Sequence, residues 1–320
     1  MLRMDGFKYH HASSPEEAVE LYASLETAMY IAGGTDLLPN LKHRIVRPAH
    51  LIGIGRALPS GWTTKAGVIE IGAGTRLTAL SKMTEVPPLA HAAGLVAGPQ
   101  IRNMGTIGGN VLLDTRCLYY NQTEFWRKSL GWCLKAEGDW CHVIGGPKTC
   151  VAAQSSDTVP VLLAMDASIR LLGPDGTRDL RLRDLYQFNG MDHLKIMPGE
   201  LLTHVCVPEP AAGFRGTYLK LRRRDSIDFP QLGLAVAAEF SGDRLDAIEI
   251  VVGAVNPQPR PIRKLESFIG KALDTAAIDE IAALVEKQTR PQDSIIGDST
   301  WRRSMAGHFA RQALTELARG

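Results

Sequence analysis

Two glycine-rich loops constrain the fold of this chain more than any other feature. They are Ile31-Ala-Gly-Gly-Thr-Asp-Leu37, directly after a short apolar segment, and Gly105-Thr-Ile-Gly-Gly-Asn110. A single Gly-Gly loop is more often a tight turn, but two such loops favour a cradle of backbone N–H groups for a pyrophosphate. Neither loop contains Lys or Arg, and no G-x-G-x-x-G follows a strand. The sequence therefore gives no support for a nicotinamide-type Rossmann site.

The order of the predicted elements favours an α+β fold. Ser14 and Pro15 predict a helix start, and this helix continues through Ala23. Strands are expected over residues 28–32, 51–54, 68–77, 159–172, 218–221, 232–240 and 247–255, and helices over residues 79–96, 275–288 and 299–318. Pro87 and Pro88 interrupt the second helix. Because the last strands precede the last helices, segregated layers are favoured over a doubly wound sheet.

Length, charge and composition exclude several classes of protein. A chain of 320 residues suggests two or three domains, and a net charge of +2 is too balanced for a nucleic-acid-binding protein. No apolar run approaches the ~18 residues that span a bilayer, and the N-terminus has no export signal. The expected compartment is therefore the cytoplasm.

Common catalytic motifs are missing from the sequence. It contains no Walker loop, no H-E-x-x-H, no C-x-x-C and no G-x-S-x-G. These absences remove the usual signals for nucleotide hydrolysis, metalloprotease, thioredoxin-like and α/β-hydrolase chemistry.

Four of the five cysteines are clustered, at Cys117, Cys133, Cys141 and Cys150. The same segment holds three of the five Trp residues, which would surround a metal with apolar side chains. In a reducing compartment, clustered cysteines indicate metal or redox chemistry before disulfides. Four thiolates suit a tetrahedral zinc ion or a [4Fe–4S] cluster, and the spacing of 15, 7 and 8 intervening residues matches neither standard pattern.

Alternatives to a four-cysteine metal site stay open at this point. The cysteines could each pack as small hydrophobic side chains, and His142 could compete as a ligand or lie outside the first shell of donors. Cys206 lies alone in a strand-like segment and is expected in the core.

The chain resembles the FAD-binding medium subunit of the xanthine oxidase family of molybdenum hydroxylases over nearly its full length. The resemblance rests on the two glycine loops and on the segments Asp157-Thr-Val-Pro-Val-Leu-Leu-Ala-Met-Asp166 and Tyr218-Leu-Lys-Leu-Arg-Arg-Arg-Asp-Ser-Ile-Asp-Phe-Pro230. It implies an α+β FAD-binding domain in two parts, residues 1–55 and 56–212, followed by a C-terminal α+β domain over residues 213–320. We expect that C-terminal domain to make subunit contacts.

The resemblance also implies which residues bind FAD. The two glycine loops would hold the diphosphate, an acid at Asp157 would fix the cofactor, and Lys220 would lie near the isoalloxazine. The expected FAD-binding residues are Tyr30, Ile31, Ala32, Gly33, Gly34, Thr35, Asp36, Leu37, Val96, Gly105, Thr106, Ile107, Gly108, Gly109, Asn110, Asp157 and Lys220. Asp157 could instead be a plain helix N-cap, and Lys220 a surface lysine beside three arginines.

An insertion distinguishes this chain from the usual medium subunit. Asn110 and Asp157 are 47 positions apart, where the family pattern needs about nine or ten. The insertion, residues 114–154, contains all four clustered cysteines and looks like that of the 4-hydroxybenzoyl-CoA reductase β subunits. That likeness implies an extra [4Fe–4S] cluster on Cys117, Cys133, Cys141 and Cys150.

The implied role is electron transfer, because the substrate site of such a complex lies in another subunit. A molybdopterin-containing large subunit would convert 4-hydroxybenzoyl-CoA to benzoyl-CoA, and a small [2Fe–2S] subunit would connect it to FAD. Reduced ferredoxin would be the donor, attracted by a local excess of +2 over residues 115–150 of the insertion. An oxidative hydroxylase subunit and a zinc-stapled scaffold remain the alternatives.

Overall fold

The first of three sheets lies in the N-terminal part of the computed structural model, which describes residues 2–319. Its strands β1 (Lys8–His11), β3 (His50–Gly53) and β2 (Ala28–Ile31) are parallel and neighbours in that order. Helix α1 (Pro15–Ser24) connects β1 to β2, and the Ser14 hydroxyl caps it by accepting a hydrogen bond from the Glu17 N–H. The predicted start of this helix is confirmed. Helix α2 (Leu37–Lys42) follows the first glycine loop.

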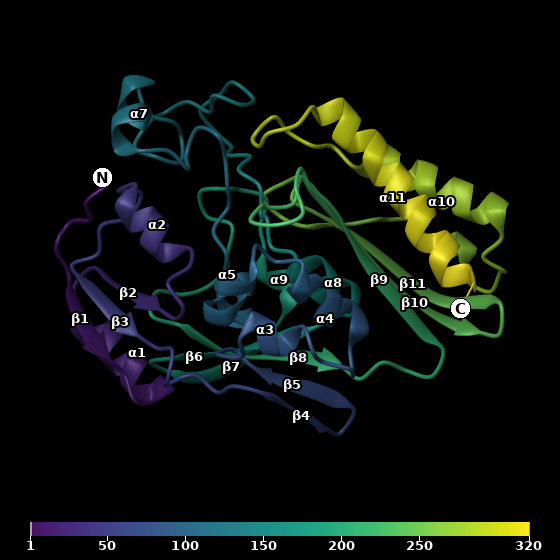
Figure 1. Ribbon diagram of the computed structural model, residues 1–320, viewed down its shortest axis with the longest axis horizontal. Helices are drawn as coiled ribbons and strands as arrows, with labels where there is room; N and C mark the ends of the chain where they lie inside the picture. The colour runs from purple at the N-terminus through teal and green to yellow at the C-terminus, as the bar shows by residue number, and fades with distance from the viewer. Residues whose placement is uncertain (1, 320) are drawn as a thin grey trace.

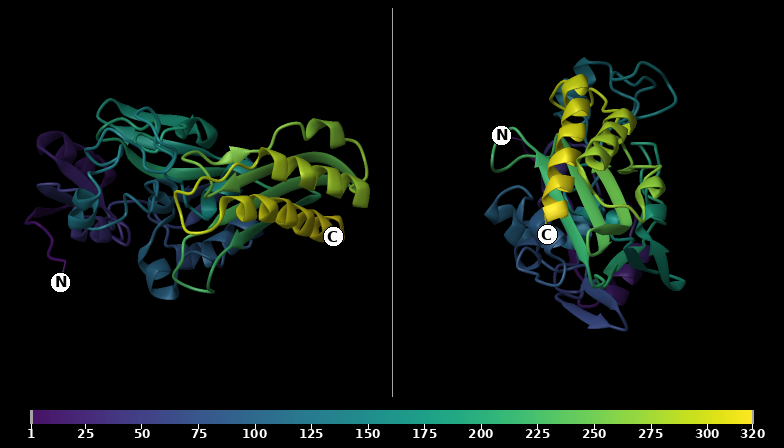
Figure 2. Two further views of the ribbon diagram at one scale, coloured as in Figure 1. Left: turned by 90° about the horizontal axis from the view of Figure 1, so that it is seen from above. Right: turned by 90° about the vertical axis from the view of Figure 1, so that its right-hand side faces the viewer.

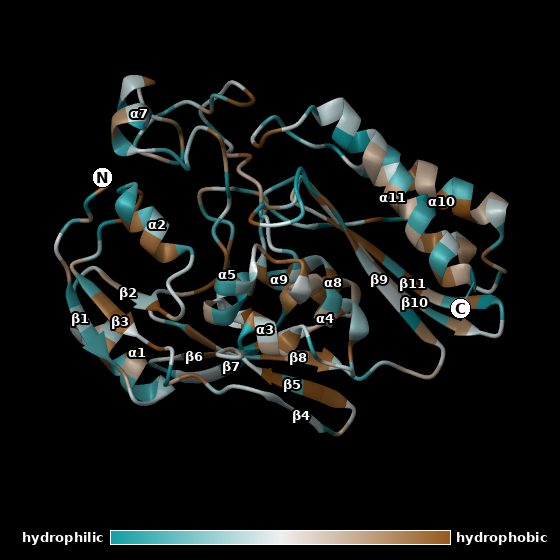
Figure 3. Cartoon of the chain, in the orientation of Figure 1, coloured by the Kyte–Doolittle hydropathy of each residue, from teal (hydrophilic) through white to brown (hydrophobic). Residues whose placement is uncertain are grey.

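The second sheet is antiparallel and carries a group of short helices on one side (Figure 1). Its order is β4-β5-β8-β6-β7. The strands are β4 (Trp62–Lys65), β5 (Val68–Gly72), β6 (Ser168–Gly173), β7 (Gly176–Arg181) and β8 (Leu201–Pro208). The helices are α3 (Leu77–Leu80), α4 (Pro87–Gly94), α5 (Pro99–Met104), α6 (Ile107–Val111), α8 (Thr158–Ala164) and α9 (Leu182–Leu185). Ile69 and Ile71 of β5 are fully buried in the main hydrophobic core, and much of this strand is brown in Figure 3.

The third sheet and two long helices form the C-terminal part. The strands β9 (Phe214–Leu221), β10 (Leu232–Ser241), β11 (Arg244–Gly253) and β12 (Arg260–Pro261) are antiparallel neighbours in sequence order. Helices α10 (Thr275–Gln288) and α11 (Ser299–Arg319) run side by side and cover one face of the sheet (Figures 1 and 2). Their apolar faces and the sheet share one hydrophobic core.

The insertion projects away from the sheets and contains one short helix, α7 (Glu124–Ser129) (Figure 1). Two antiparallel hydrogen bonds close its base, where Arg116 and Ala153 each donate through N–H to the other's carbonyl at 2.8 Å. We call this base, residues 114–116 and 153–155, the neck of the insertion.

The α+β class is confirmed, and two predicted strands are each about half wrong. The predicted strand 68–77 ends at Gly72, as β5. Residues 158–164 form α8, and only the second half of the predicted strand 159–172 is extended, as β6. Pro160 explains the error, because proline fits the first turn of a helix but removes a hydrogen bond from a central strand. The predicted helix over residues 79–96 is two short helices, α3 and α4, separated before Pro87. Within residues 2–319 no helix is both long and apolar enough to cross a membrane.

Nearly all residues of helix α8 are buried. A substitution in this helix therefore tests the packing between the second and third sheets. Leu162 is fully buried, and α8 contacts both β10 and β11. Leu162→Ala is expected to lower the free energy of unfolding by about 2–5 kcal/mol, because it leaves a cavity in a closed core. Chemical denaturation measures this, with Leu130→Ala on the exposed end of α7 as the control. Equal effects of the two substitutions would contradict the packing described.

Candidate functional site

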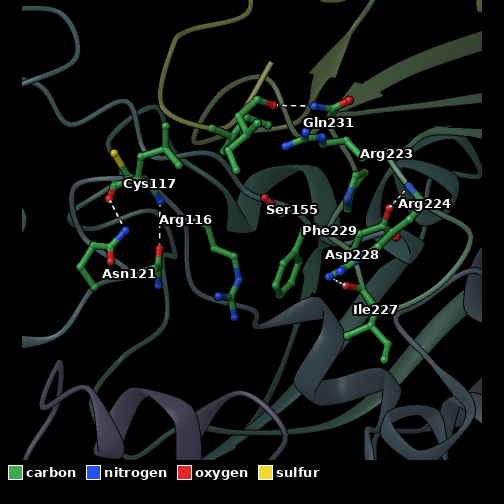
Figure 4. A pocket seen from close by; sticks show the side chains of 15 residues that line it. Arg116, Cys117, Asn121, Ser155, Arg223, Arg224, Ile227, Asp228, Phe229 and Gln231 are labelled. Atoms are coloured by element: carbon green, nitrogen blue, oxygen red, sulfur yellow. Dashed lines mark hydrogen bonds between the residues drawn. The ribbon is translucent and has the colours of Figure 1, made fainter.

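Two cavities meet at Phe229, and both glycine loops lie at the first of them. The glycine-loop cavity has a volume of about 400 Å³ and is bounded by the ends of β2 and β8 and by the segment around α6. The neck cavity has a volume of about 810 Å³ and lies between the neck of the insertion, residues 223–231 and residues 295–296 (Figure 4). Phe229 lines both cavities.

The first glycine loop is shaped by close contact with the segment before the second. Gly33 lies against the main-chain carbonyl of Met104, and a Cβ atom at this position would overlap that oxygen. Gly34 adopts φ +71°, a conformation that favours glycine. Both glycines are therefore required to bring the loops together, and the Arg76 side chain donates a hydrogen bond to the same Met104 carbonyl.

The second glycine loop begins α6. The Thr106 hydroxyl caps this helix by accepting a hydrogen bond from the Gly109 N–H at 3.1 Å. The Asn110 Oδ1 accepts hydrogen bonds from the hydroxyls of Ser156 and Thr158, both at 2.6 Å. These bonds join the second loop to the start of α8, on the far side of the insertion.

Most of the residues expected to bind FAD line the glycine-loop cavity. They are Tyr30, Ile31, Ala32, Gly33, Gly34, Thr35, Asp36, Leu37, Val96, Gly105, Thr106, Gly108, Gly109 and Asn110. Three do not: Ile107 is buried in the main core, and Asp157 and Lys220 lie behind the cavity wall. Sequence reasoning missed Asp114, Glu200 and Phe229, which also line it. Only Phe229 carried a signal, since it lies within residues 218–230, on which the resemblance rests.

Asp157 and Lys220 form a buried ion pair between α8 and β9. The Lys220 ammonium donates to an Asp157 carboxylate oxygen at 3.1 Å and to the carbonyls of Leu95 and Asp228 at 2.9 and 3.1 Å. The Tyr218 hydroxyl donates to the other Asp157 oxygen at 2.8 Å. Burial raises the pKa of Asp157 to about 6, although Lys220 and Tyr218 oppose the shift.

Both simpler interpretations of this pair are wrong in the structure. Asp157 occupies the N-cap position of α8, but its side chain makes no capping hydrogen bond, because the carboxylate is taken by Tyr218 and Lys220. The Lys220 side chain is only 1% exposed, so it is not a surface lysine.

The four clustered cysteines of the insertion line one pocket, which we call the cysteine pocket. Cys117, Cys133, Cys141 and Cys150 are all buried and have no disulfide partner. Burial raises the pKa of Cys117 to about 12 and also raises the pKa of Cys150. A thiol in these surroundings becomes a thiolate only when a positive charge compensates it, as a metal does.

The geometry of the cysteine pocket bears on the kind of metal it could take. Among residues 2–319, no three His, Cys, Asp or Glu side chains converge closely enough for one metal ion. A zinc site holds its sulfurs within about 4 Å of one another, because each Zn–S bond is about 2.3 Å. A four-iron cluster would bind each of four thiolates through a different iron. The pocket of about 10 Å³ has room for about one water, so the loop would have to open around a cluster.

Two other candidate residues, His142 and Cys206, each have an environment different from that of the four clustered cysteines. The His142 Nε2 lies 2.5 Å from the carbonyl oxygen of Trp132, so this ring nitrogen is engaged with the main chain. Cys206 is buried in β8, and its prediction as a core residue is confirmed.

Ionic contacts of the neck connect the cysteine pocket to the glycine-loop cavity. The Lys135 ammonium lines the cysteine pocket and donates to the Asp114 carboxylate and the Thr115 hydroxyl, both at 2.6 Å. Asp114 in turn lines the glycine-loop cavity. Arg116 forms an ion pair with Asp36 of the first glycine loop.

The expected positive surface of the insertion is mostly internal. Arg116 and Lys135 have carboxylate partners, and Arg127 donates to the carbonyls of His43 and Arg44. Lys128 and Lys148 are the exposed cations among the five counted in the sequence. Most of the positive charge therefore stabilises contacts within and around the insertion. Little of it is free to produce an electrostatic field at the surface.

Two family models together cover almost the whole chain. Residues 5–210 match the FAD binding domain in molybdopterin dehydrogenase, and residues 216–317 match the CO dehydrogenase flavoprotein C-terminal domain. The chain belongs to the FAD-binding medium subunits of the molybdenum hydroxylase family. The expected family and its α+β fold are thereby confirmed.

Relatives of this family match the chain over most of its length. The carbon monoxide dehydrogenase medium chain of Afipia carboxidovorans is 31% identical and covers 96% of this chain and 95% of its own. The aldehyde oxidoreductase FAD-binding subunit PaoB of Escherichia coli is 33% identical over 84% of this chain and 87% of its own. A crystal structure of Cu,Mo-CO dehydrogenase has a TM-score of 0.80 at 28% identity and covers 99% of each chain.

The buried ion pair behind the cavity gives a pH-dependent prediction. Lys220→Met is expected to destabilise the protein by about 3–5 kcal/mol at pH 8, because it leaves the Asp157 carboxylate buried and unpaired. Without Lys220 the pKa of Asp157 rises further above its unfolded value, so the folded variant takes up a proton as the pH falls. The deficit relative to the unsubstituted protein should therefore be smaller at pH 5 than at pH 8.

Denaturant titrations across this pH range measure the deficit. The control is the double variant Asp157→Asn with Lys220→Met, in which no carboxyl group is left at this site to titrate, so its free energy of unfolding should lack the rise at low pH that Lys220→Met shows. A deficit of Lys220→Met that grows as the pH falls would show that Asp157 is not the partner that matters.

Proposed function

We propose that this chain is the electron-transfer subunit of a molybdenum-dependent reductase of the 4-hydroxybenzoyl-CoA reductase type. Electrons from a low-potential donor such as ferredoxin would pass through a [4Fe–4S] cluster and FAD toward [2Fe–2S] clusters and the molybdenum subunit. One observation carries the proposal: four buried cysteines surround a single pocket beside the cavity of the glycine loops. The chain itself would carry cofactors and no substrate site.

The glycine-loop cavity is the proposed site of FAD. Gly33, Gly34, Gly108 and Gly109 present main chain to the cavity without side chains, which suits a diphosphate bound by amides. Because the two cavities meet at Phe229, together they form one elongated space for a cofactor. The expected residues that line the cavity are proposed to contact FAD directly.

Asp157 and Lys220 are proposed to shape the FAD site from behind its wall. Lys220 donates to the carbonyls of Leu95 and Asp228, the neighbours of the lining residues Val96 and Phe229. Since the ammonium is committed to these bonds and to Asp157, it fixes the positions of two wall segments. Ile107 supports the second glycine loop through the core in the same indirect way.

Cys117, Cys133, Cys141 and Cys150 are proposed to hold the [4Fe–4S] cluster. Soft thiolate donors favour iron–sulfur clusters. The bound iron would compensate the negative charge of the thiolates, which burial otherwise disfavours. Tyr119, Tyr120 and His142 around the pocket would limit the access of solvent. A four-iron core adds a low-potential centre, as reduction of an electron-rich aromatic ring requires.

The partners follow from the same proposal. A molybdopterin-containing large subunit and a [2Fe–2S] small subunit would complete the complex as a heterotrimer or as a dimer of heterotrimers. Exposed apolar side chains at the far end of the insertion, Phe125, Trp140 and Ile144, would offer contact area to a donor protein close to the cysteine pocket. The C-terminal domain is proposed to make the contacts between subunits.

An oxidative hydroxylase is the second candidate, favoured by the relatives. They include a carbon monoxide dehydrogenase, an aldehyde oxidoreductase and a glyceraldehyde dehydrogenase, each named for an oxidation. In such a complex electrons would leave through this chain rather than enter. A zinc-stapled scaffold without redox function would use the same four cysteines.

Cofactor analysis tests the site assignments. Protein purified without air is expected to contain about four iron and four acid-labile sulfides with one FAD per chain. Cys133→Ser should lose iron while retaining flavin, and Cys206→Ser, the matched control in β8, should retain both. Gly33→Val should lose flavin while retaining iron, since its side chain would overlap the Met104 carbonyl.

Different contents would reject different parts of the proposal. One zinc in place of iron would reject the cluster and favour the scaffold. Iron that survives in Cys133→Ser would reject the assigned ligands, and absence of flavin from the assembled complex would reject the FAD site.

Activity of the assembled complex decides between the two redox directions. The reductase proposal predicts that complex supplied with reduced ferredoxin converts 4-hydroxybenzoyl-CoA to benzoyl-CoA, measured by chromatography. Cys133→Ser should reduce this rate by at least about tenfold, because the entry centre is removed. Oxidation of aldehydes or heterocycles with an artificial acceptor, together with no conversion of the thioester, would favour the hydroxylase.

A further inference from the structure

We propose that Arg116, contributed by the insertion, is a binding residue for the diphosphate of FAD. The inference rests on the proposed FAD site and adds a cation that neither glycine loop provides. No feature of the loops themselves indicates such a residue, because Arg116 is 80 positions from its partner Asp36.

Arg116 lies at the boundary of the two cavities. Its side chain lines the neck cavity and is ion-paired with Asp36, which lines the glycine-loop cavity. The guanidinium carbon lies 3.8 Å from the centre of the Phe229 ring, the residue common to both cavities. Figure 4 shows the side chain extending into the neck cavity beside Phe229. The cation is therefore directed at the junction through which an elongated cofactor would pass.

The neck of the insertion holds Arg116 in place. Its main chain forms both hydrogen bonds of the bridge to Ala153, and the next residue, Cys117, lines the cysteine pocket. The stacking on Phe229 and the ion pair with Asp36 fix the planar end of the side chain. A preformed cation of this kind costs little conformational entropy when it binds an anion.

The charges around Arg116 leave it suited to an anionic ligand. Asp36 alone would repel a diphosphate at the first glycine loop, and the guanidinium neutralises that carboxylate. The Nε–H group of Arg116 is buried and has no hydrogen-bond partner within residues 2–319. A buried donor without a partner is costly, and an acceptor oxygen of a bound ligand would satisfy it. Burial also lowers the pKa of Arg116 to about 10, which reflects its removal from water.

Equilibrium binding of FAD to the cofactor-depleted full chain, followed by flavin fluorescence, tests this role without any turnover. Arg116→Gln is expected to weaken FAD binding at least about tenfold, because a charge-assisted contact is lost. Arg116→Lys, which keeps the charge without the planar stack, should give an intermediate affinity. Lys128→Gln, the same loss of charge on the exposed face of α7, should leave the affinity unchanged.

A variant of the partner residue separates ligand binding from support of the loop. Asp36→Asn removes the ion pair but leaves the cation, so the affinity for FAD should fall less than in Arg116→Gln. If Asp36→Asn weakens binding as much as Arg116→Gln, Arg116 acts only through the loop and the inference is overturned. Unchanged affinity in Arg116→Gln overturns it as well. Failure of the unsubstituted chain to bind FAD would instead reject the proposed function.

Discussion

The buried ion pair between Asp157 and Lys220 is the interaction on which the arrangement of this molecule depends. It joins α8, which packs on the second sheet, to β9 in the third sheet. Through the carbonyls of Leu95 and Asp228 the same ammonium fixes two segments of the cavity wall. A charge pair without exposure to water needs all of its hydrogen bonds, so the surrounding segments have little freedom to move.

The insertion depends on a second constraint, which is its two-residue bridge. The segment has some forty residues and one short helix, so regular secondary structure contributes little to its stability. It is held instead by the bridge between Arg116 and Ala153 at its base and by the packing of its buried cysteines and aromatic side chains. Burial raises the pKa of Cys117 and of Cys150 and so disfavours their thiolates. Metal binding would therefore release protons and supply folding energy to this segment.

The glycine loops were recognisable in the sequence because their requirement is local. Gly34 needs a positive φ, and Thr106 caps the helix that follows it, so short motifs specify both. The roles of Asp157 and Lys220 were not local. Their positions came from a resemblance, and their burial against each other depends on the contact of α8 with β9 and could not be derived from either segment. The helix α8 was mistaken for a strand because its residues are apolar or small and six of the seven are buried, so no polar face reveals a helical periodicity.

The sequence by itself determined the family, the α+β class, the two glycine loops and the clustering of four cysteines, because each depends on residue types at short spacing. Tertiary structure alone decided that the cysteines line one pocket and that its neck reaches the glycine-loop cavity. It also decided that Phe229 and Arg116 lie where the two cavities meet. Contacts between residues 80 positions apart depend on how the chain closes on itself, and no local pattern encodes that closure.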